Sequence, residues 1–182
     1  MPSKAVSSRA IFWDRDGTLI EDRGYLHDPS DVVLYPGTIT ALRKLQEDFL
    51  FFMVTNQVGV AKGLITAAQL QTVNEHLLSL LKQEGISFTG VYVCPHRKED
   101  NCVCRKPEPY FVKIAASEHQ LDLSRSFVVG DHPSDLELAR RSGAKGIYVC
   151  TGHGANHLNE LPAGEIALKD IGAVAAWILA QP

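Results

Sequence analysis

Two acidic residues, Asp14 and Asp16, follow an apolar run in the segment IFWDRDGTLI, and the turn pair Gly17-Thr18 comes directly after them. The two-residue spacing places both side chains on the same side of an extended strand. One carboxylate could attack phosphorus and form an aspartyl-phosphate. The other could give a proton to the leaving alkoxide and then take one from the hydrolytic water. The segment therefore predicts phosphoryl-transfer chemistry at a strand end.

Further acidic residues follow another strand-like run and could join this pair. Because the carboxyl ends of parallel strands share one edge of a sheet, residues distant in the sequence can meet there. Asp131 follows the run at 126–129, and with Asp14 and the backbone carbonyl of Asp16 it would form the oxygen-rich site that Mg²⁺ prefers. The role of Asp135 stays open between a metal partner and a helix-start charge.

A phosphoryl group needs hydrogen-bond donors as well as a metal ion. Thr55 and Asn56 follow the apolar run at 49–54 and offer a hydroxyl and an amide, and Lys106 offers an ammonium group. Such donors hold an anion beside a metal. In phosphoryl transfer the catalyst mainly aligns the reacting groups and neutralises charge on the equatorial oxygens. We therefore expect these three residues to bind the phosphoryl group.

Apolar runs alternate with helix-like segments along the chain. The runs are continuously apolar, as is typical of strands covered on both faces, and they lie at 10–13, 49–54, 90–93, 126–129, 146–149 and 166–168. The predicted helices lie at 38–47, 67–84, 109–119, 134–142 and 171–180. This alternation predicts an α/β fold with a doubly wound, Rossmann-like parallel sheet. The length of 182 residues suits one domain over residues 1–182.

Two long irregular segments, 21–37 and 94–109, follow strand ends, where α/β sheets place their ligand sites. The second contains three thiols and an imidazole within eleven residues: Cys94, His96, Cys102 and Cys104. These groups could fill a tetrahedral Zn²⁺ shell, and a closed shell leaves no position for substrate. We therefore expect a structural zinc that fixes the loop and, with it, Lys106. Neither segment is long enough for a large cap domain, so both should form the rim of an open site.

Four motifs occur in order along the chain: DRDGTL, VTNQ, CRKPEP and GDHPSD. They resemble the four signatures of the haloacid dehalogenase superfamily of phosphatases. The resemblance implies the fold of that superfamily, with Asp14 as the nucleophile and Asp16 as the general acid and base. It also implies that Thr55 and Lys106 hold the phosphoryl group during catalysis and that Asp131 binds Mg²⁺.

The segment CPH…CVCRKP resembles two related branches of that superfamily, the heptose bisphosphate phosphatases and the histidinol-phosphate phosphatases. The segments DRGYLH and NQVGVAKGLIT are similar to those of the heptose branch. This resemblance implies removal of the 7-phosphate from a heptose 1,7-bisphosphate. The residues expected to contact the substrate are Arg15, Asp22, Arg23, Gly24, Tyr25, Thr55, Asn56, Gln57, Arg105 and Lys106. One alternative is a histidinol-phosphate phosphatase, a related group that lacks the GYxH element. An alternative of another class is a non-catalytic, zinc-stabilised binding module.

Composition and charge indicate which partners and which cellular location the protein is expected to have. Apolar residues make up 45% of the chain and the formal net charge is −3, so no basic field favours nucleic-acid binding or a DNA 3′-end phosphatase. No apolar run approaches the roughly 20 residues of a membrane span. The first ten residues, MPSKAVSSRA, lack the apolar stretch of a signal peptide. We expect a cytoplasmic monomer that acts on a small sugar phosphate and needs neither a membrane nor nucleic acid.

Overall fold

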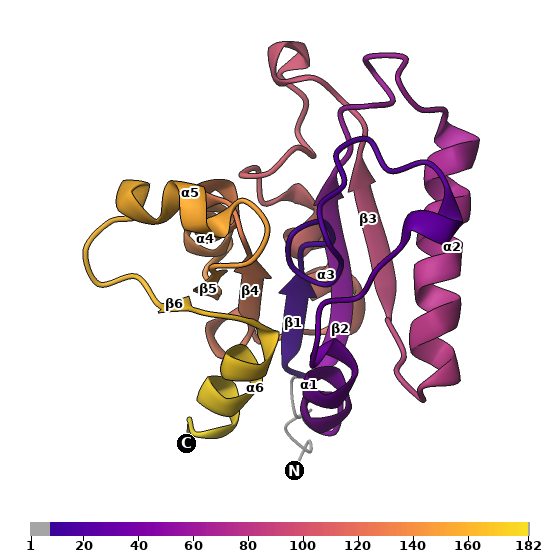
Figure 1. The fold of residues 1–182 in the computed structure, drawn as a ribbon. Helices are drawn as coiled ribbons and strands as arrows, with labels where there is room; N and C mark the ends of the chain where they lie inside the picture. The colour runs from indigo at the N-terminus through magenta and orange to yellow at the C-terminus, as the bar shows by residue number, and fades with distance from the viewer. Residues whose placement is uncertain (1–7, 182) are drawn as a thin grey trace.

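The computed structural model describes residues 8–181, and it contains one six-stranded parallel sheet in the order β3-β2-β1-β4-β5-β6 (Figure 1). The strands are β1 Ala10–Trp13, β2 Leu50–Asn56, β3 Gly90–Cys94, β4 Phe127–Gly130, β5 Lys145–Val149 and β6 Ala167–Leu168. This confirms the predicted α/β class with a parallel sheet. The signal-peptide prediction rests largely on residues 1–7, which lie outside the described residues.

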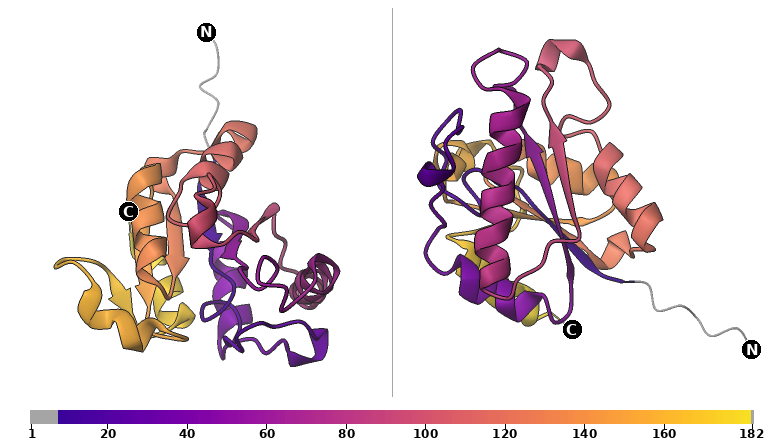
Figure 2. Two further views of the ribbon diagram at one scale, coloured as in Figure 1. Left: turned by 90° about the horizontal axis from the view of Figure 1, so that it is seen from above. Right: turned by 90° about the vertical axis from the view of Figure 1, so that its right-hand side faces the viewer.

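The two faces of the sheet are covered by different helices (Figure 2). One face packs against α1 Thr38–Leu45, α2 Ala67–Gln83 and α6 Ile171–Leu179. The other packs against α3 Tyr110–His119 and α4 Pro133–Ser142. Every predicted helix and strand is present, with ends that differ from the prediction by at most two residues. The short helix α5 Gly154–His157 was not predicted, nor were the 3₁₀ turns at Pro29–Asp31, Lys98–Asp100, Leu123–Arg125 and Leu158–Glu160.

Alternation along the strands explains why both faces carry a core. In β1, Ile11 and Trp13 point into the core under α1, α2 and α6, whereas Phe12 points into the core under α3 and α4. All of β1 is buried, because the strand lies inside the sheet with a helical layer on each side. Burying large apolar side chains stabilises the fold by about 1.5–3 kcal/mol each. The continuous apolar runs of the sequence therefore reflect coverage on both faces.

Local signals fix the helices that flank the site. Thr66 and Gln69 form a reciprocal capping box at the start of α2, which satisfies backbone N–H groups that the helix itself leaves unpaired. Pro133 occupies the first turn of α4 and Gly143 ends it in the left-handed conformation, as each residue type favours.

None of the helices formed by residues 8–181 combines the length and the apolar character required to span a bilayer.

Strand order determines where side chains can meet. The chain proceeds outward from β1 through β2 to β3, then returns to the other side of β1 and proceeds through β4 and β5 to β6. Trp13 of β1 is in register with Met53 of β2 and Val129 of β4. The residues after these three strands therefore emerge side by side at the carboxyl edge. In open α/β sheets this reversal of strand order is where ligands bind.

Candidate active site

The carboxylate that follows β1 lies against a buried ammonium group. Asp14 continues the sheet by donating its backbone N–H to Val129 O at 2.9 Å. Lys106 Nζ lies 2.5 Å from Asp14 Oδ1 and 2.7 Å from Asp135 Oδ1. Burial alone would lower the pKa of Lys106, but Asp135 and Asp14 outweigh it and raise that pKa above its ordinary value. The lysine is therefore a fixed positive charge next to the first carboxylate.

Three carboxylates converge on this position: those of Asp14, Asp131 and Asp135, with oxygens within 4.8 Å of one another. Burial raises the pKa of Asp14 to about 6, although the Lys106 ammonium opposes the shift. Burial, with the neighbouring Asp14 charge, raises the pKa of Asp131 to about 8. Three buried carboxylates against one ammonium group leave excess negative charge. A hard divalent cation with oxygen ligands fits that excess.

Asp135 belongs to this group, although the sequence left its role open. Its side chain is 1% exposed, and its Oδ1 forms an ion pair with Lys106 without hydrogen-bond geometry. The backbone N–H of His132 donates to Oδ2 of Asp135 at 3.2 Å. Asp135 therefore both starts α4 and adds charge to the site, so the two interpretations weighed for it are compatible.

Two turns that contain Gly17 and Gly152 pack closely against the Asp131 carboxylate. Its Oδ2 accepts a 2.7 Å hydrogen bond from the backbone N–H of His153. Gly17 and Gly152, both with positive φ, approach so closely that a Cβ on either would overlap that carboxylate. Thr151 Oγ1 donates to Gly17 O and joins the two turns. Glycine is therefore required at both positions by backbone conformation and by space.

We expect Gly17→Ala to lower the phosphatase activity predicted from the sequence by at least about tenfold and to weaken its apparent Mg²⁺ affinity, because the added Cβ would displace a carboxylate predicted to bind the ion. The matched control is Gly164→Ala, which also has positive φ but has no atom within 4 Å of the added Cβ. Both variants carry backbone strain of about 1–3 kcal/mol. Titration of phosphatase activity with Mg²⁺ checks the prediction, and equal apparent Mg²⁺ affinities in the two variants would contradict it.

Asp16 is not one of the three clustered carboxylates, and its side chain is fixed by neighbours instead. Arg15 Nε lies 3.1 Å from each Asp16 oxygen, and Gln57 Nε2 donates to Asp16 Oδ2 at 2.6 Å. Gln57 also donates to Thr55 Oγ1 at 2.8 Å. Burial raises the pKa of Asp16 above its ordinary value, while the Arg15 charge lowers it. A raised pKa suits a carboxyl group that must carry a proton for part of a reaction cycle.

Two residues predicted to bind the phosphoryl group, Asn56 and Lys106, are linked across 50 residues of sequence. Asn56 Oδ1 accepts from the backbone N–H of Lys106 at 3.0 Å, and Asn56 Nδ2 donates to the Lys106 carbonyl at 3.3 Å. The end of β2 thereby holds the loop that carries the lysine. Asn56 was predicted to contact the substrate, and the structure gives it this second task of positioning Lys106.

These groups line a cavity of about 790 Å³. Most of the residues predicted to contact the substrate also line it, and two do not. The predicted contacts that line it are Asp22, Gly24, Tyr25, Thr55, Asn56, Gln57, Arg105 and Lys106. Arg15 and Arg23 do not line it. Arg15 has no exposed surface, so its predicted substrate contact is not supported, and Arg23 forms an ion pair with Glu21 at 2.9 Å.

His153 is a cavity residue for which the sequence offered no role. Besides the backbone bond to Asp131, its Nε2 lies 2.8 Å from Asp22 Oδ2. It therefore connects the segment after β1 to the turn after β5. The signal that could have identified it is the TGHG turn, because it follows a strand at the same sheet edge as the catalytic motifs.

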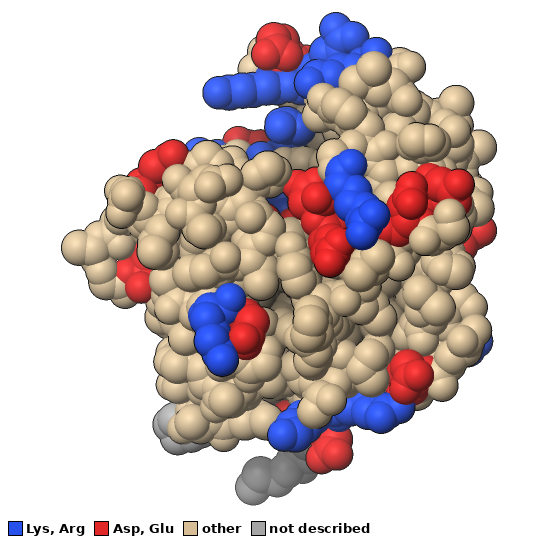
Figure 3. All heavy atoms as spheres, in the orientation of Figure 1, with Lys and Arg blue, Asp and Glu red and all other residues tan. Residues whose placement is uncertain are grey.

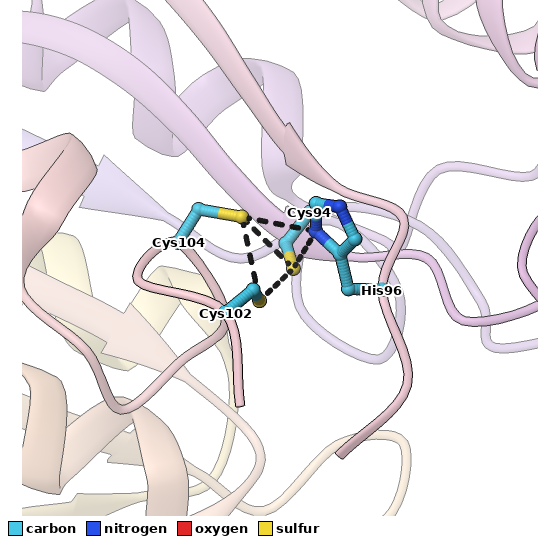
Figure 4. A group of neighbouring side chains, drawn as sticks. All are labelled: Cys94, His96, Cys102 and Cys104. Atoms are coloured by element: carbon cyan, nitrogen blue, oxygen red, sulfur yellow. Dashed lines mark hydrogen bonds between the residues drawn. The ribbon is translucent and has the colours of Figure 1, made fainter. Parts of the chain in front are cut away.

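The four predicted zinc ligands lie together in the loop after β3 (Figure 4). Cys104 Sγ is 3.3 Å from Cys94 Sγ, 3.6 Å from Cys102 Sγ and 3.3 Å from His96 Nδ1. Cys94 Sγ is 3.6 Å from Cys102 Sγ and 3.7 Å from His96 Nδ1. A tetrahedral ion with Zn–S bonds of about 2.3 Å has ligand–ligand edges of about 3.8 Å. The donor types and spacings therefore fit Zn²⁺.

The three thiols of this group differ in how readily they ionise. Burial raises the pKa of Cys94 to about 12 and raises that of Cys104, so these two thiols resist ionisation in the absence of a positive charge. Burial at Cys102 is outweighed by hydrogen bonds with Cys104 and Cys94, which lower its pKa to about 7. A bound Zn²⁺ would supply that charge and hold the sulfurs as thiolates. Lys106 follows Cys104 by two residues. The last of the four predicted zinc ligands therefore lies two residues before the lysine predicted to hold the phosphoryl group.

Comparison with known proteins agrees with this geometry. The family described as HAD-hydrolase-like matches residues 103–172. The D-glycero-beta-D-manno-heptose-1,7-bisphosphate 7-phosphatase of Helicobacter pylori strain J99 is 34% identical over 175 residues, which cover 95% of this chain and 98% of that protein. The protein of the same name from Bordetella bronchiseptica is 33% identical over 177 residues, covering 95% and 99% of the two chains.

A solved structure is similar as well. It is the crystal structure of the D,D-heptose 1,7-bisphosphate phosphatase from B. bronchiseptica in complex with magnesium and phosphate. Its TM-score to this chain is 0.87 at 33% sequence identity, and the match covers 94% of this chain and 98% of the other. Magnesium and phosphate are the ligands that the charges and donors described above would accept.

Proposed function

This chain belongs to the heptose 1,7-bisphosphate 7-phosphatases of the haloacid dehalogenase superfamily, and we propose that it hydrolyses the 7-phosphate of a heptose 1,7-bisphosphate. One observation carries the proposal beyond family membership. The Asp14 carboxylate, the Lys106 ammonium group and the Asp131 carboxylate lie together in the wall of one cavity. We propose that residues 1–182 act as one phosphatase domain and work as a monomer in the cytoplasm.

In the first step an Asp14 oxygen attacks the phosphorus of the 7-phosphate, and the bond from phosphorus to the sugar oxygen breaks. The Asp16 carboxyl group donates its proton to that leaving oxygen, which departs as the sugar hydroxyl. With a pKa of about 6, Asp14 is mostly ionised at neutral pH and can act as a nucleophile. Lys106 and Thr55 hold the equatorial oxygens and neutralise their charge.

In the second step a water molecule attacks the phosphorus of the aspartyl-phosphate. Asp16 accepts a proton from that water, and the bond between phosphorus and Asp14 breaks. The products are inorganic phosphate and a free Asp14 carboxylate, and Asp16 is again protonated. The side chains of Arg15 and Gln57 keep Asp16 in one orientation through both transfers.

We assign a Mg²⁺ site to the carboxylates of Asp14 and Asp131 with the backbone carbonyl of Asp16. Bound there, the ion would offset the excess negative charge and polarise the phosphoryl oxygens. Asp135 adds to the negative potential and holds Lys106. We assign the Zn²⁺ site to Cys94, His96, Cys102 and Cys104, with a structural role because all four positions of the tetrahedron are filled by the chain.

Substrate recognition is assigned to the cavity rim. Figure 3 shows Lys and Arg side chains gathered over the part of this face where the loop after β3 projects. Lys98 and Arg105 of that loop line the cavity, and we assign them to the second phosphate. Asp22 and Tyr25 line the cavity in the segment after β1, and they offer oxygens to the sugar hydroxyls.

A phosphate-release panel tests this proposal. The substrates are both anomers of D-glycero-D-manno-heptose 1,7-bisphosphate and histidinol phosphate, each with excess Mg²⁺. We expect kcat/KM for one bisphosphate anomer to exceed that for histidinol phosphate by about 100-fold or more, because sites built for a polar group reject ligands that lack it. NMR of the product should show a heptose 1-phosphate.

Two arginine variants provide the control for that panel. Arg105→Ala should raise the KM for the bisphosphate, whereas Arg23→Ala should not, since only Arg105 lines the cavity. Faster hydrolysis of histidinol phosphate would favour the histidinol-phosphate phosphatase alternative. Absence of phosphate release from all three substrates would favour the non-catalytic binding module.

A further inference from the structure

Arg15 is a charged side chain sealed inside the protein. It has no exposed surface, and its guanidinium lies against the neighbouring Asp16 carboxylate. Nε is 3.1 Å from both Asp16 oxygens and Nη2 is 3.0 Å from Oδ1. A planar guanidinium presents its donors in a fixed fork, so its orientation sets the orientation of the carboxylate that it binds. The position of Asp16 therefore depends on what fixes Arg15.

The group that fixes the far side of Arg15 comes from α2. Asn74 Oδ1 accepts a 2.8 Å hydrogen bond from Arg15 Nη1, across 59 residues of sequence. The other buried residues of α2 are Leu70, Val73, Leu77 and Leu81. A polar side chain at a buried position of an otherwise apolar helix face costs free energy unless it is hydrogen-bonded. Asn74 meets that requirement through the arginine.

Asp16 is thus held from two directions. From the cavity side Gln57 donates to its Oδ2 and also to Thr55 Oγ1. From the core side Arg15 binds both oxygens and is itself held by Asn74. We propose that Asn74 is a positioning residue for proton transfer by Asp16 and that it acts through Arg15. The proposal rests on the proposed function, in which Asp16 protonates the leaving oxygen.

Loss of the Asn74 acceptor would leave one buried N–H of Arg15 without a partner. The guanidinium would then rotate toward another acceptor and carry the Asp16 carboxylate with it. A misplacement of about 1 Å at a reacting group can cost about 100-fold in rate. The loss should fall on the proton transfers made by Asp16, because the Asn74 side chain hydrogen-bonds to Arg15 and not to Asp14 or Lys106. In formation of the aspartyl-phosphate, that loss appears only when the leaving group needs a proton.

The test compares two leaving groups in Asn74→Leu, which replaces the amide with an apolar side chain of similar size. A sugar alkoxide needs a proton to depart, whereas p-nitrophenolate departs without one. We expect kcat for the sugar phosphate to fall about 10–100-fold with KM changed less than about twofold. The first-turnover release of p-nitrophenolate, which precedes the attack of water on the aspartyl-phosphate, should change less than about twofold, whereas first-turnover release of the sugar should slow with kcat.

Three further variants complete the test. Asn74→Asp keeps an acceptor at the same position and should restore most of the sugar-phosphate activity. Gln71→Ala, one turn earlier on the exposed face of α2, should match the wild type, since Gln71 hydrogen-bonds only to Glu75. If Asn74→Leu fails to fold, Asn74→Ala must show the same selective loss for the sugar phosphate.

Equal losses in the first-turnover release of the two leaving groups, or no loss for either, would overturn the positioning role. These outcomes are separate from failure of the proposed function. A wild-type protein that releases no phosphate from any sugar phosphate refutes the function. An active wild type whose Asn74 variants release both leaving groups more slowly in the first turnover, and by the same factor, refutes only the role of Asn74.

Discussion

Asp14→Asn should reduce phosphate release by at least about 10⁴-fold, since removal of the nucleophile in covalent catalysis costs rates of this order. The amide has nearly the shape of the carboxylate but cannot form the acyl phosphate. Mass spectrometry of acid-quenched protein should detect an aspartyl-phosphate at residue 14 in the wild type and none in the variant. Retention of activity in Asp14→Asn would refute the covalent mechanism.

The fold should survive this substitution. The pKa of Asp14 is raised to about 6 in the folded protein from an ordinary value of 3.8. A carboxyl group with a raised folded-state pKa destabilises the folded state as the pH rises through that interval, and the effect is complete above pH 6. The neutral amide lacks this penalty, so metal-free Asp14→Asn at pH 8 should melt at or above the wild-type temperature. Asp31→Asn, an exposed change, controls for loss of one negative charge.

The second large effect is expected from loss of zinc. Metal analysis should find about one zinc per chain in the wild type, and Cys104→Ser should lower that content. A loss of about 3 kcal/mol would lower the melting temperature of a chain of this size by about 6–12 °C. Activity in excess Mg²⁺ should fall at least about tenfold, because Lys106 follows the altered ligand by two residues and a misplaced reacting group is costly.

Cys150→Ser is the matched control for the zinc variant, since Cys150 is a free thiol outside the four-ligand group. It should leave zinc content, melting temperature and activity near the wild-type values. A zinc-selective chelator should reproduce the Cys104→Ser phenotype in the wild type, with Mg²⁺ kept in excess. An unchanged melting temperature after zinc removal would exclude a structural role for the metal.

The fold was predictable because its signals are local. Strands covered on both faces produce continuous apolar runs, and β1 was placed at its observed ends. Pro133 and Gly143 marked the limits of α4 through backbone preferences that depend on one residue at a time. The four-residue helix α5 was missed because GANH has no apolar repeat and too few residues to show one.

The sequence identified most residues of the site, but it did not show where each side chain points or which distant residue it contacts. The motifs identified Asp14, Lys106 and Asp131, which the structure brings together. Arg15 was expected to contact the substrate, yet its side chain is fully buried, because it lies between Asp14 and Asp16 and successive side chains of an extended chain point to opposite sides. Its contact with Asn74 joins residues 59 positions apart. A spacing pattern within one segment carries no information about such a pair.

Because β1 lies in the middle of the sheet, most residues proposed to break the phosphate ester bond lie apart from the segments proposed to select the substrate. In the proposed mechanism, bond breaking depends on residues at the ends of β1, β2 and β4, which are adjacent strands inside the sheet, together with Lys106 from the loop after β3. Admission of a substrate is assigned to the segment after β1 and to the rest of the loop after β3, which line the cavity. Sequence changes in these rim segments that leave Lys106 and the four zinc ligands in place should therefore redirect the protein to other phosphate esters while the hydrolytic chemistry stays the same.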